Sequence, residues 1–213
     1  MAKLTTLPSA MGGTRSFSTC QPALEITTYF SKWSAMSDYV SQENALNSIF
    51  LGTSALGFSE PELMVKCATL NDFYSTYIFK VYYVVQHYLS VPNLAKRLAT
   101  GDVTLVDDLR KVPTPRSASP IDFYSFATKF CSHHNPVAFP ICDKFAINAL
   151  YEFKKRDNFY CFTKCSLSNY QNYIKAIDEF RVYYGLTGYS YKDIDKYLWL
   201  IGREIDGKII TFP

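Results

Sequence analysis

The sequence predicts an all-α fold, and three observations support this prediction. Apolar residues recur at helix-like spacing along most of the chain, beginning with the segment Pro22–Val40. Helix-start signals are frequent: Ser59 precedes Pro61, and Ser190 lies three residues before Asp193. Hydrophobic residues make up 48% of the 213 residues, which is enough for a packed core. We therefore expect a single helical domain over residues 1–213, with roughly nine or ten helices.

The first half of the chain is expected to hold several helices in succession. Pro22–Val40 and Gln42–Leu51 carry helical periodicity, and the glycines of segment 52–57 predict a turn. Ser59 caps the next predicted helix, which carries Leu63, Met64, Cys67 and Leu70. The run Asn71–Val85 is apolar almost all round, which predicts a buried central helix, although its β-branched and aromatic content also permits a strand.

Two shorter helices are expected next, Pro92–Leu98 and Leu105–Val112. The following segment 113–120 is rich in Pro and Ser and predicts a loop. We interpret this loop as a hinge that separates an N-terminal helical half, residues 22–112, from a catalytic half, residues 121–213.

The second half is expected to contain four helices. Ile121–His133 is followed by an Asn135-Pro136 turn, and Asp143 begins a helix that reaches Phe153. Two capping boxes, Ser168 with Gln171 and Ser190 with Asp193, predict the last two helices, the first of which ends at Gly185.

Charge and cysteine usage limit the class of protein. A net charge of +3 is compatible with a polyanionic partner but does not require one. The six cysteines form no CxxC pair, and their spacing fits neither a zinc ribbon nor an iron–sulfur cluster. We expect reduced, mostly buried cysteines in a cytoplasmic protein without cofactor or metal. No run of apolar residues is long enough for a transmembrane helix, so no membrane partner is expected.

One stretch stands out, running from Tyr124 to Asp143: YSFATKFCSHHNPVAFPICD. It resembles the core of the helix-hairpin-helix DNA glycosylase superfamily, most closely the 8-oxoguanine glycosylase type. In that family a Gly-x-Gly-x-Lys hairpin supplies a catalytic lysine, and a Pro-containing turn ends in a catalytic aspartate. The resemblance places the hairpin at Ser125–Lys129 and the turn at Asn135–Asp143. It implies a compact glycosylase-like fold with a cleft between two helical halves.

The chemistry of the family gives Lys129 and Asp143 their expected roles. Cleavage of an N-glycosidic bond builds positive charge on the sugar, and a carboxylate at Asp143 stabilises that charge or activates water. An amine at Lys129 attacks the sugar carbon only when it is unprotonated, so this role requires Lys129 to be at least partly enclosed. Without the resemblance, Asp143 is also explained as a helix cap and Lys129 as a solvated lysine.

The resemblance also implies a DNA contact surface around the pair. A flipped base is read by hydrogen bonds and aromatic stacking, so the expected base pocket contains His133, Asn135, Phe126 and Tyr124. The DNA backbone is expected to contact Ser125, Thr128, Lys154, Lys155 and Arg156. A metal site built from Cys131 and the two histidines is not expected, because adjacent histidines point in different directions on a helix.

Two departures from the family pattern keep rival functions open: both hairpin glycines are replaced, and the segment between Lys129 and Asp143 is several residues shorter than in the 8-oxoguanine branch. Ser125 and Ala127 replace both hairpin glycines, and a Cβ at either position restricts the approach of a DNA phosphate. This degenerate hairpin suggests a divergent glycosylase, with or without lyase activity, that acts on modified phage DNA in bacterial defence. It equally suggests a catalytically inactive helical module that binds DNA or protein. An enzyme acting on nucleotides or RNA is a third interpretation, since 16% aromatic residues suit any base.

Overall fold

The computed structural model describes residues 17–50, 57–115 and 117–207. These residues form an all-α fold, as the sequence predicts, with one short hairpin as the only sheet in the described ranges. The helices are α1 (Pro22–Ser34), α2 (Ser37–Phe50), α3 (Glu60–Phe73), α4 (Val81–Ser90), α5 (Leu94–Thr100), α6 (Leu105–Arg110), α7 (Tyr124–His134), α8 (Lys144–Asp157), α9 (Tyr170–Tyr183) and α10 (Tyr191–Ile205). Two 3-10 turns (Phe17–Thr19, Cys165–Ser168) and strands β1 (Lys111–Val112) and β2 (Ile121–Asp122) complete the described elements.

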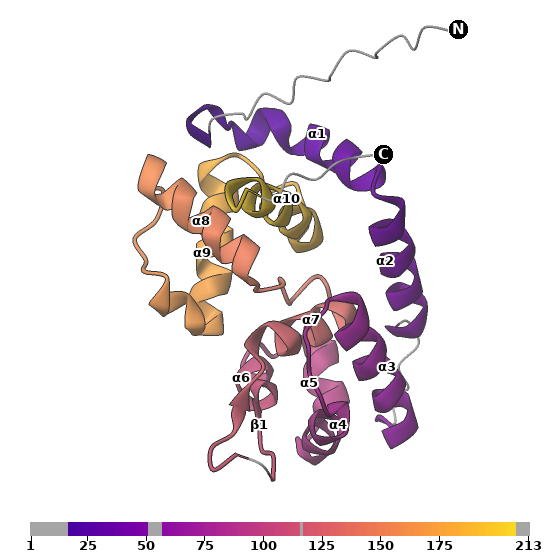
Figure 1. Cartoon of the computed structure of the whole chain (residues 1–213). Helices are drawn as coiled ribbons and strands as arrows, with labels where there is room; N and C mark the ends of the chain where they lie inside the picture. The colour runs from indigo at the N-terminus through magenta and orange to yellow at the C-terminus, as the bar shows by residue number, and fades with distance from the viewer. Residues whose placement is uncertain (1–16, 51–56, 116, 208–213) are drawn as a thin grey trace, which may run out of the picture.

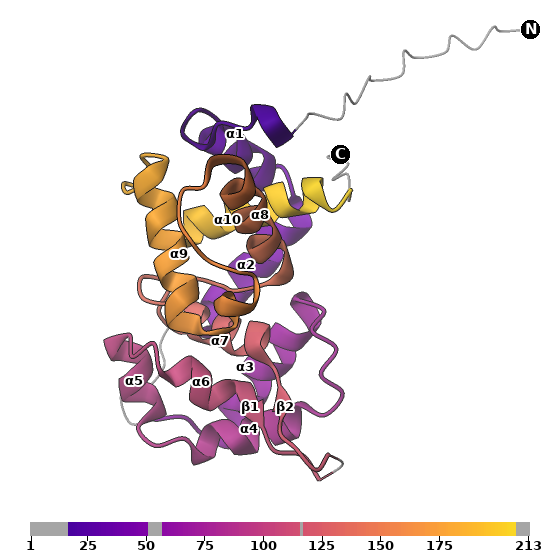
Figure 2. The same ribbon diagram turned by 90° about the vertical axis from the view of Figure 1, so that its left-hand side faces the viewer.

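The helices form two groups, which Figures 1 and 2 show from two sides. The upper group contains α1, α8, α9 and α10, and the closest packing in it is between α8 and α10. The lower group contains α3 to α7 and the hairpin, with α3 packed on α4 and α6 on α7. Helix α2 runs along one side, from the upper group to the lower.

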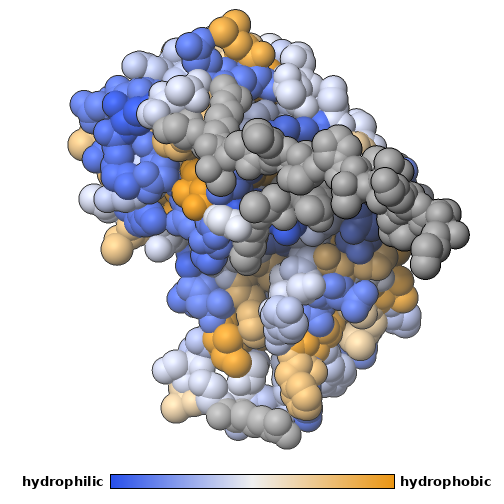
Figure 3. All heavy atoms as spheres, turned by 45° about the horizontal axis from the view of Figure 1, so that its top comes forward, coloured by the Kyte–Doolittle hydropathy of each residue, from blue (hydrophilic) through white to orange (hydrophobic). Residues whose placement is uncertain are grey.

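The core is continuous through both groups and is rich in aromatic side chains. Phe130 of α7 packs on Tyr88 of α4 and Phe50 of α2 in the lower group, and Phe153 of α8 packs on Phe180 of α9 in the upper group. On the face drawn in Figure 3, hydrophilic side chains cover much of the upper part, apolar side chains also gather at its top edge, and further apolar patches lie lower down. Four of the six cysteines are buried and all six are free thiols.

The run Asn71–Val85 does not form the expected central helix. Helix α3 ends at Phe73, and Ser75 and Tyr77 have positive φ angles of 47° and 55°. The Asn71 side chain holds this turn, because its Oδ1 accepts hydrogen bonds from Ile78 N (2.9 Å) and Thr76 Oγ1 (2.7 Å). An amide side chain that satisfies backbone groups in this way competes with helix continuation.

Other boundaries also differ from the expected ones. Pro22–Val40 is two helices, because the chain turns at Ala35 and the Met36 side chain is buried at the corner. Helix α6 stops at Arg110, since residues 111–112 pair with residues 121–122 in the hairpin, and α7 therefore begins only at Tyr124. Asn169, rather than Ser168, caps α9. The turn predicted for 52–57 lies outside the described residues except for Gly57.

The described residues of segment 113–120, which was expected as a hinge, connect the two strands of this hairpin. Helices α6 and α7 on either side of it pack on each other, and Arg110 forms an ion pair with Asp122 at 2.7 Å. Helix α7 therefore belongs with the lower group, and α1 belongs with α10 in the upper group. The two groups do not divide the chain at residues 113–120.

Candidate functional site

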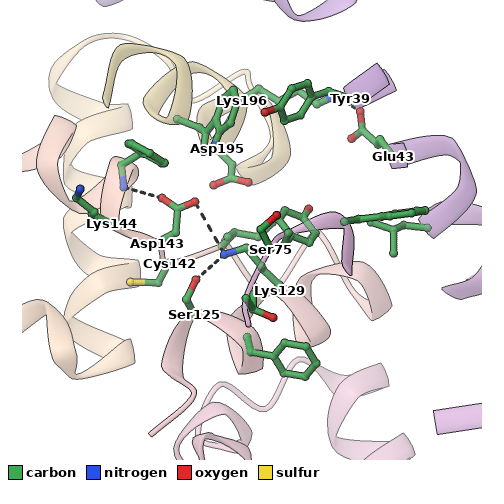
Figure 4. Close-up of a pocket in the computed structure, with 18 of the residues that line it drawn as sticks. Tyr39, Glu43, Ser75, Ser125, Lys129, Cys142, Asp143, Lys144, Asp195 and Lys196 are labelled. Carbon is green, nitrogen blue, oxygen red and sulfur yellow. Dashed lines mark hydrogen bonds and ion pairs between the residues drawn. The ribbon is translucent and has the colours of Figure 1, made fainter. Parts of the chain in front are cut away.

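A cleft of about 800 Å³ lies between the two groups of helices. Its walls come from α1, α2, the turn after α3, the start of α7, the segment before α8, and α10. Aromatic side chains provide much of the lining: Trp33, Tyr39, Phe73, Tyr74, Phe123, Tyr124, Phe126, Phe145 and Trp199. Lysine and acidic residues meet at its centre, as Figure 4 shows.

Lys129 lies in the middle of α7 and is only 4% exposed. Its Nζ donates a hydrogen bond to Ser125 Oγ, one turn earlier on the same helix, and lies 5.0 Å from the centre of the Tyr74 ring. The same Nζ lies 4.0 Å from Asp143 Oδ2. The structure thus encloses the amine, which the sequence-based hypothesis required.

Asp143 is the N-cap of α8, as the sequence predicts. Its Oδ1 accepts hydrogen bonds from Phe145 N and Ala146 N, both at 2.9 Å, while Oδ2 is directed toward Lys129. The positive end of the α8 dipole and the Lys129 ammonium both favour a negative charge at this position.

The segment that carries Asp143 is fixed to α7 and α9 by buried hydroxyl groups. Thr128 Oγ1 accepts a hydrogen bond from Cys142 N at 3.0 Å. Tyr170 and Tyr173 of α9 donate to the carbonyl oxygens of Pro140 (2.7 Å) and Ile141 (2.6 Å). Because these groups are buried, the bonds are costly to break and hold Asp143 opposite Lys129.

Asp195 of α10 is a third ionisable group at the centre, and no local sequence pattern indicated it. Figure 4 shows its carboxyl group directed toward the space between Asp143 and Lys129. Burial and the negative charge of Asp143 raise the pKa of Asp195 to about 8, against the opposing effect of Lys192 and Lys129. We therefore expect Asp195 to be mainly protonated at neutral pH.

Glu43 of α2 links this helix to α10 across the cleft through hydrogen bonds and ion pairs. It accepts hydrogen bonds from Lys196 Nζ (2.9 Å) and Trp33 Nε1 (3.2 Å), and Lys192 Nζ lies 3.6 Å away. Burial opposes the charged form, but the Lys196 hydrogen bond and the two lysine charges keep the pKa of Glu43 below its usual value. Glu43 therefore stays ionised and orients both lysines.

The expected base pocket is only partly present in the cleft. Phe126 and Tyr124 line it, whereas His133 and Asn135 do not. His133 Nε2 lies 3.0 Å from the Tyr74 hydroxyl, behind the cleft wall. Asn135 donates to the carbonyl oxygen of Leu98 (3.0 Å), at the end of α5, so its side chain joins helices instead of facing a base.

The residues expected to contact a DNA backbone are also separated. Ser125 lines the cleft as the partner of Lys129, and Thr128 is fully buried. Lys154, Lys155 and Arg156 lie at the other end of α8, roughly 16 Å from Asp143 along the helix axis. Arg156 donates to the carbonyl oxygens of Phe17 and Cys20 and pairs with Asp157, so it has a structural role.

The hairpin expected at Ser125–Lys129 is helical, because all five residues lie inside α7. Ser125 and Ala127, at the positions where the resemblance to helix-hairpin-helix glycosylases expects glycines, therefore lie in a regular helix and not in a turn. Besides Lys129, the basic groups that line the cleft are Lys144 at the start of α8 and Lys192, Lys196 and Arg203 of α10. Sequence reasoning had no signal for these residues, since each is an ordinary charged position on an amphipathic helix.

Comparison with known proteins identifies a family but no activity. The family model described as HI_0787_N, N-terminal domain, matches residues 25–138, which is more than half of the chain. The chain belongs to this family. The matched range contains Lys129 and ends before Asp143 and Asp195.

A relative supports the same relationship. An uncharacterized protein of Haemophilus influenzae is 42% identical over 135 residues, which is 63% of this chain and 63% of the relative. The match therefore spans less than two thirds of that protein. No solved structure matches the chain. In the described residues, no helix combines the length and apolar character needed to cross a membrane.

Proposed function

We propose that this protein is a DNA glycosylase that flips a modified base into the cleft and cleaves its N-glycosidic bond, leaving an abasic site. The observation that carries the proposal is the meeting of buried Lys129 and the α8 cap Asp143, at 4.0 Å, in an aromatic cleft. It is also the pair that the resemblance to helix-hairpin-helix glycosylases implies, although the hairpin itself is absent from residues 125–129.

Asp143 supplies the main catalytic contribution in this proposal. As the bond to the base breaks, positive charge develops on the deoxyribose, and an ionised carboxylate stabilises that charge and accepts a proton from the attacking water. Lys129 supports Asp143 through their ion pair, and Ser125 orients the amine. Amine attack by Lys129, which would add lyase activity, is the second role open to this residue.

Aromatic side chains suited to contacting DNA lie both inside the cleft and in the turn beside it. Aromatic rings line it, and base–aromatic stacking contributes about 1–3 kcal/mol per base. The turn after α3 contributes Ser75 and Thr76 to the lining, and beyond it project Tyr77 (90% exposed) and Phe79 (86% exposed). Exposed rings held in a turn next to the cleft are suited to contacting the bases that flank an extruded nucleotide.

The size of the cleft suits a bulky modified base. Drug-sized ligands occupy pockets of about 300–1,000 Å³, and this cleft has about 800 Å³. A base enlarged by modification, as in phage DNA, fits such a volume. The extension of the proposal to defence against phage DNA rests on the divergence of residues 125–129 from the glycosylase hairpin, and the volume of the cleft is compatible with it.

A catalytically inactive helical module that binds DNA or protein is the alternative. Its supporting observation is that residues 125–129 form a regular helix rather than a phosphate-binding hairpin. An inactive module has no need for a buried lysine beside a carboxylate, because burying charge costs free energy. That cost favours the enzyme.

The test is base release from duplex DNAs that each carry one modified base: 8-oxoguanine, hypoxanthine, uracil, 7-methylguanine, 5-hydroxymethylcytosine or its glucosylated form. Wild-type protein is expected to generate abasic sites in at least one of them. Asp143→Asn keeps the helix cap, since Asn caps as well as Asp, but is expected to lose at least about a hundredfold in rate. Binding without abasic sites on any DNA would favour the inactive module, and full activity of Asp143→Asn would remove Asp143 from the mechanism.

A further inference from the structure

Asp195 differs from the other acidic residues of the cleft in having no fixed partner. Asp143 is held by two backbone N–H groups, and Glu43 by Lys196 and Trp33. Within the described residues, the Asp195 carboxyl makes no hydrogen bond and no ion pair, and it points to the centre of the cleft. A polar group aimed into a cavity in this way is available to a bound molecule.

We propose that Asp195 is a catalytic acid that donates a proton to the departing base. The proposal rests on the glycosylase function proposed above. It assigns different roles to two neighbouring carboxyl groups: Asp143 acts on the sugar and the water, and Asp195 acts on the base.

The surroundings of Asp195 hold it in the acid form that this role needs. The charged groups that act on it are the carboxylates of Asp143 and Glu43 and the cations of Lys129 and Lys192. The Tyr74, Tyr170 and Tyr173 side chains also lie near enough for charge on Asp195 to oppose their ionisation, although their hydroxyls bond to other groups. Burial and the Asp143 charge outweigh the two lysines, so the pKa of Asp195 rises to about 8. A carboxyl group with a raised pKa beside a second carboxyl group is suited to act as the acid of an acid and base pair.

The proton balance closes without a further reactant. The bond between C1′ and the base nitrogen breaks, and its electron pair stays with the base, which takes the proton of Asp195. Water attacks C1′ and gives its proton to Asp143. Asp195 is then ionised and Asp143 protonated, and transfer of that proton back to Asp195 restores the starting state. The net reaction adds one water molecule across the glycosidic bond.

This assignment defines a substrate class. A neutral base that leaves poorly as an anion needs the proton, and it must present an acceptor nitrogen or oxygen toward α10. A cationic base such as 7-methylguanine already leaves as a neutral molecule and needs no acid. Dependence on Asp195 is therefore expected only for neutral bases.

The first test needs no DNA. In protein labelled with ¹³C at aspartate carboxyl groups, the NMR signal that Asp195→Asn removes is expected to titrate near pH 8. Asp143→Asn should shift that titration downward, because it removes a negative neighbour, whereas Asp72→Asn, an exposed carboxyl on α3, should not. An Asp195 that is ionised at pH 7 would overturn its role as the acid.

The second test compares base release from DNA carrying a neutral base of the panel with release from 7-methylguanine DNA. With the neutral base, the wild-type rate of base release is expected to fall above pH 8, where Asp195 loses its proton. Asp195→Asn is expected to release this base about a hundredfold or more slowly, and its rate should no longer fall above pH 8. The rate at which Asp195→Asn releases 7-methylguanine should stay within a few fold of the wild-type rate. Asp143→Asn, in contrast, is expected to lose activity on both bases. Equal losses of Asp195→Asn on both bases would overturn the acid role while leaving the glycosylase intact. No release by wild-type protein from any DNA would overturn the glycosylase and this role together.

Discussion

The two carboxylate oxygens of Asp143 contact different groups, and this division lets its structural and chemical contributions be separated. Oδ1 caps α8 through two backbone N–H groups, and Oδ2 faces Lys129. Asn at this position keeps the cap and removes the charge. A loss of activity in Asp143→Asn with an unchanged melting temperature would therefore report chemistry rather than folding.

Lys129 is predicted to act through its charge on Asp143. Lys129→Arg should keep more of the base-release rate than Lys129→Gln, because a cation remains beside Asp143. Borohydride traps a Schiff base between an amine and the sugar. If Lys129 acts only through its charge, borohydride should trap no adduct between wild-type protein and DNA. An adduct formed by wild-type protein and lost in Lys129→Gln would instead make Lys129 a nucleophile.

The sequence predicted single residues unevenly. Asp143 follows Pro140 at a helix start, a local pattern that the structure confirms. Lys129 was found only through the family resemblance. Asp195 was missed because it lies beside the Ser190–Asp193 capping box on an amphipathic helix, where an acid is unremarkable. Its environment comes from α2, α7 and the segment before α8, which the local sequence does not reveal.

The contact between α8 and α10 sets the distance between Asp143 and Asp195. Gly202 of α10 lies against the backbone of Phe145, and a Cβ at this position would fall 2.6 Å from the Phe145 carbonyl carbon. Gly202→Ala should therefore push the helices apart and lower the free energy of unfolding by about 1–3 kcal/mol. Gly188→Ala is the matched control, since open space surrounds that position. Equal melting temperatures for the two variants would contradict this packing argument.

The turn after α3 is predicted to contact DNA through its exposed rings. Replacing Tyr77 and Phe79 by Ser should weaken binding to DNA containing an abasic site by about thirtyfold or more, since each of the two stacked bases contributes about 1–3 kcal/mol. Val182→Ser, an exposed apolar position on α9, should leave binding unchanged. Unfolding curves check that both variants fold. Equal binding by the double variant and wild type would place DNA elsewhere.

At the scale of elements, local capping signals were reliable and long apolar runs were not. Ser59, Asp143 and Ser190 each cap the helix that the sequence predicts. The run Asn71–Val85 looked like one buried helix because its composition is apolar throughout. The Asn71 side chain ends that helix by satisfying the turn at 76–78, and its competing hydrogen bonds depend on the folded turn.

The stability of the whole molecule is predicted to peak near pH 6.5. Burial lowers the pKa of His133 to about 2 and that of His134 to about 3. Below pH 6.5 the unfolded chain therefore binds more protons than the folded protein. Each histidine lowers the free energy of unfolding by about 1.4 kcal/mol for each pH unit of acidification. Asp195 has the opposite effect: its pKa is raised from 3.8 to about 8, so its contribution to stability falls as pH rises across that whole range. Above pH 6.5 the two histidines no longer offset this loss, and the fold becomes less stable up to about pH 8.

Unfolding by urea between pH 4.5 and 8.5 checks this prediction. Asp195→Asn should flatten the alkaline side, and the double variant His133→Gln with His134→Gln should flatten the acidic side. A wild-type profile that keeps rising from pH 6.5 to 8 would contradict the environment assigned to Asp195.

The cleft exists only at the scale of the whole molecule. Its charged centre joins Glu43, Lys129, Asp143 and Asp195, which come from four separate parts of the chain. Helical periodicity predicted the fold class but not how the helices pack, and so the position of the cleft and of its basic lining could not be read from the sequence. The family match relates residues 25–138 to other proteins but names no activity for them.

The central claim is that this cleft stabilises positive charge on a deoxyribose, and one binding measurement tests it without knowledge of the base. Two duplex DNAs are compared, one with a cationic pyrrolidine and one with a neutral tetrahydrofuran in place of the sugar that has lost its base. Wild-type protein is expected to bind the cationic analogue at least about tenfold more tightly, a difference of about 1.4 kcal/mol, and Asp143→Asn is expected to lose that preference. Equal affinity of wild-type protein for the two DNAs, or a preference that survives in Asp143→Asn, would contradict the account.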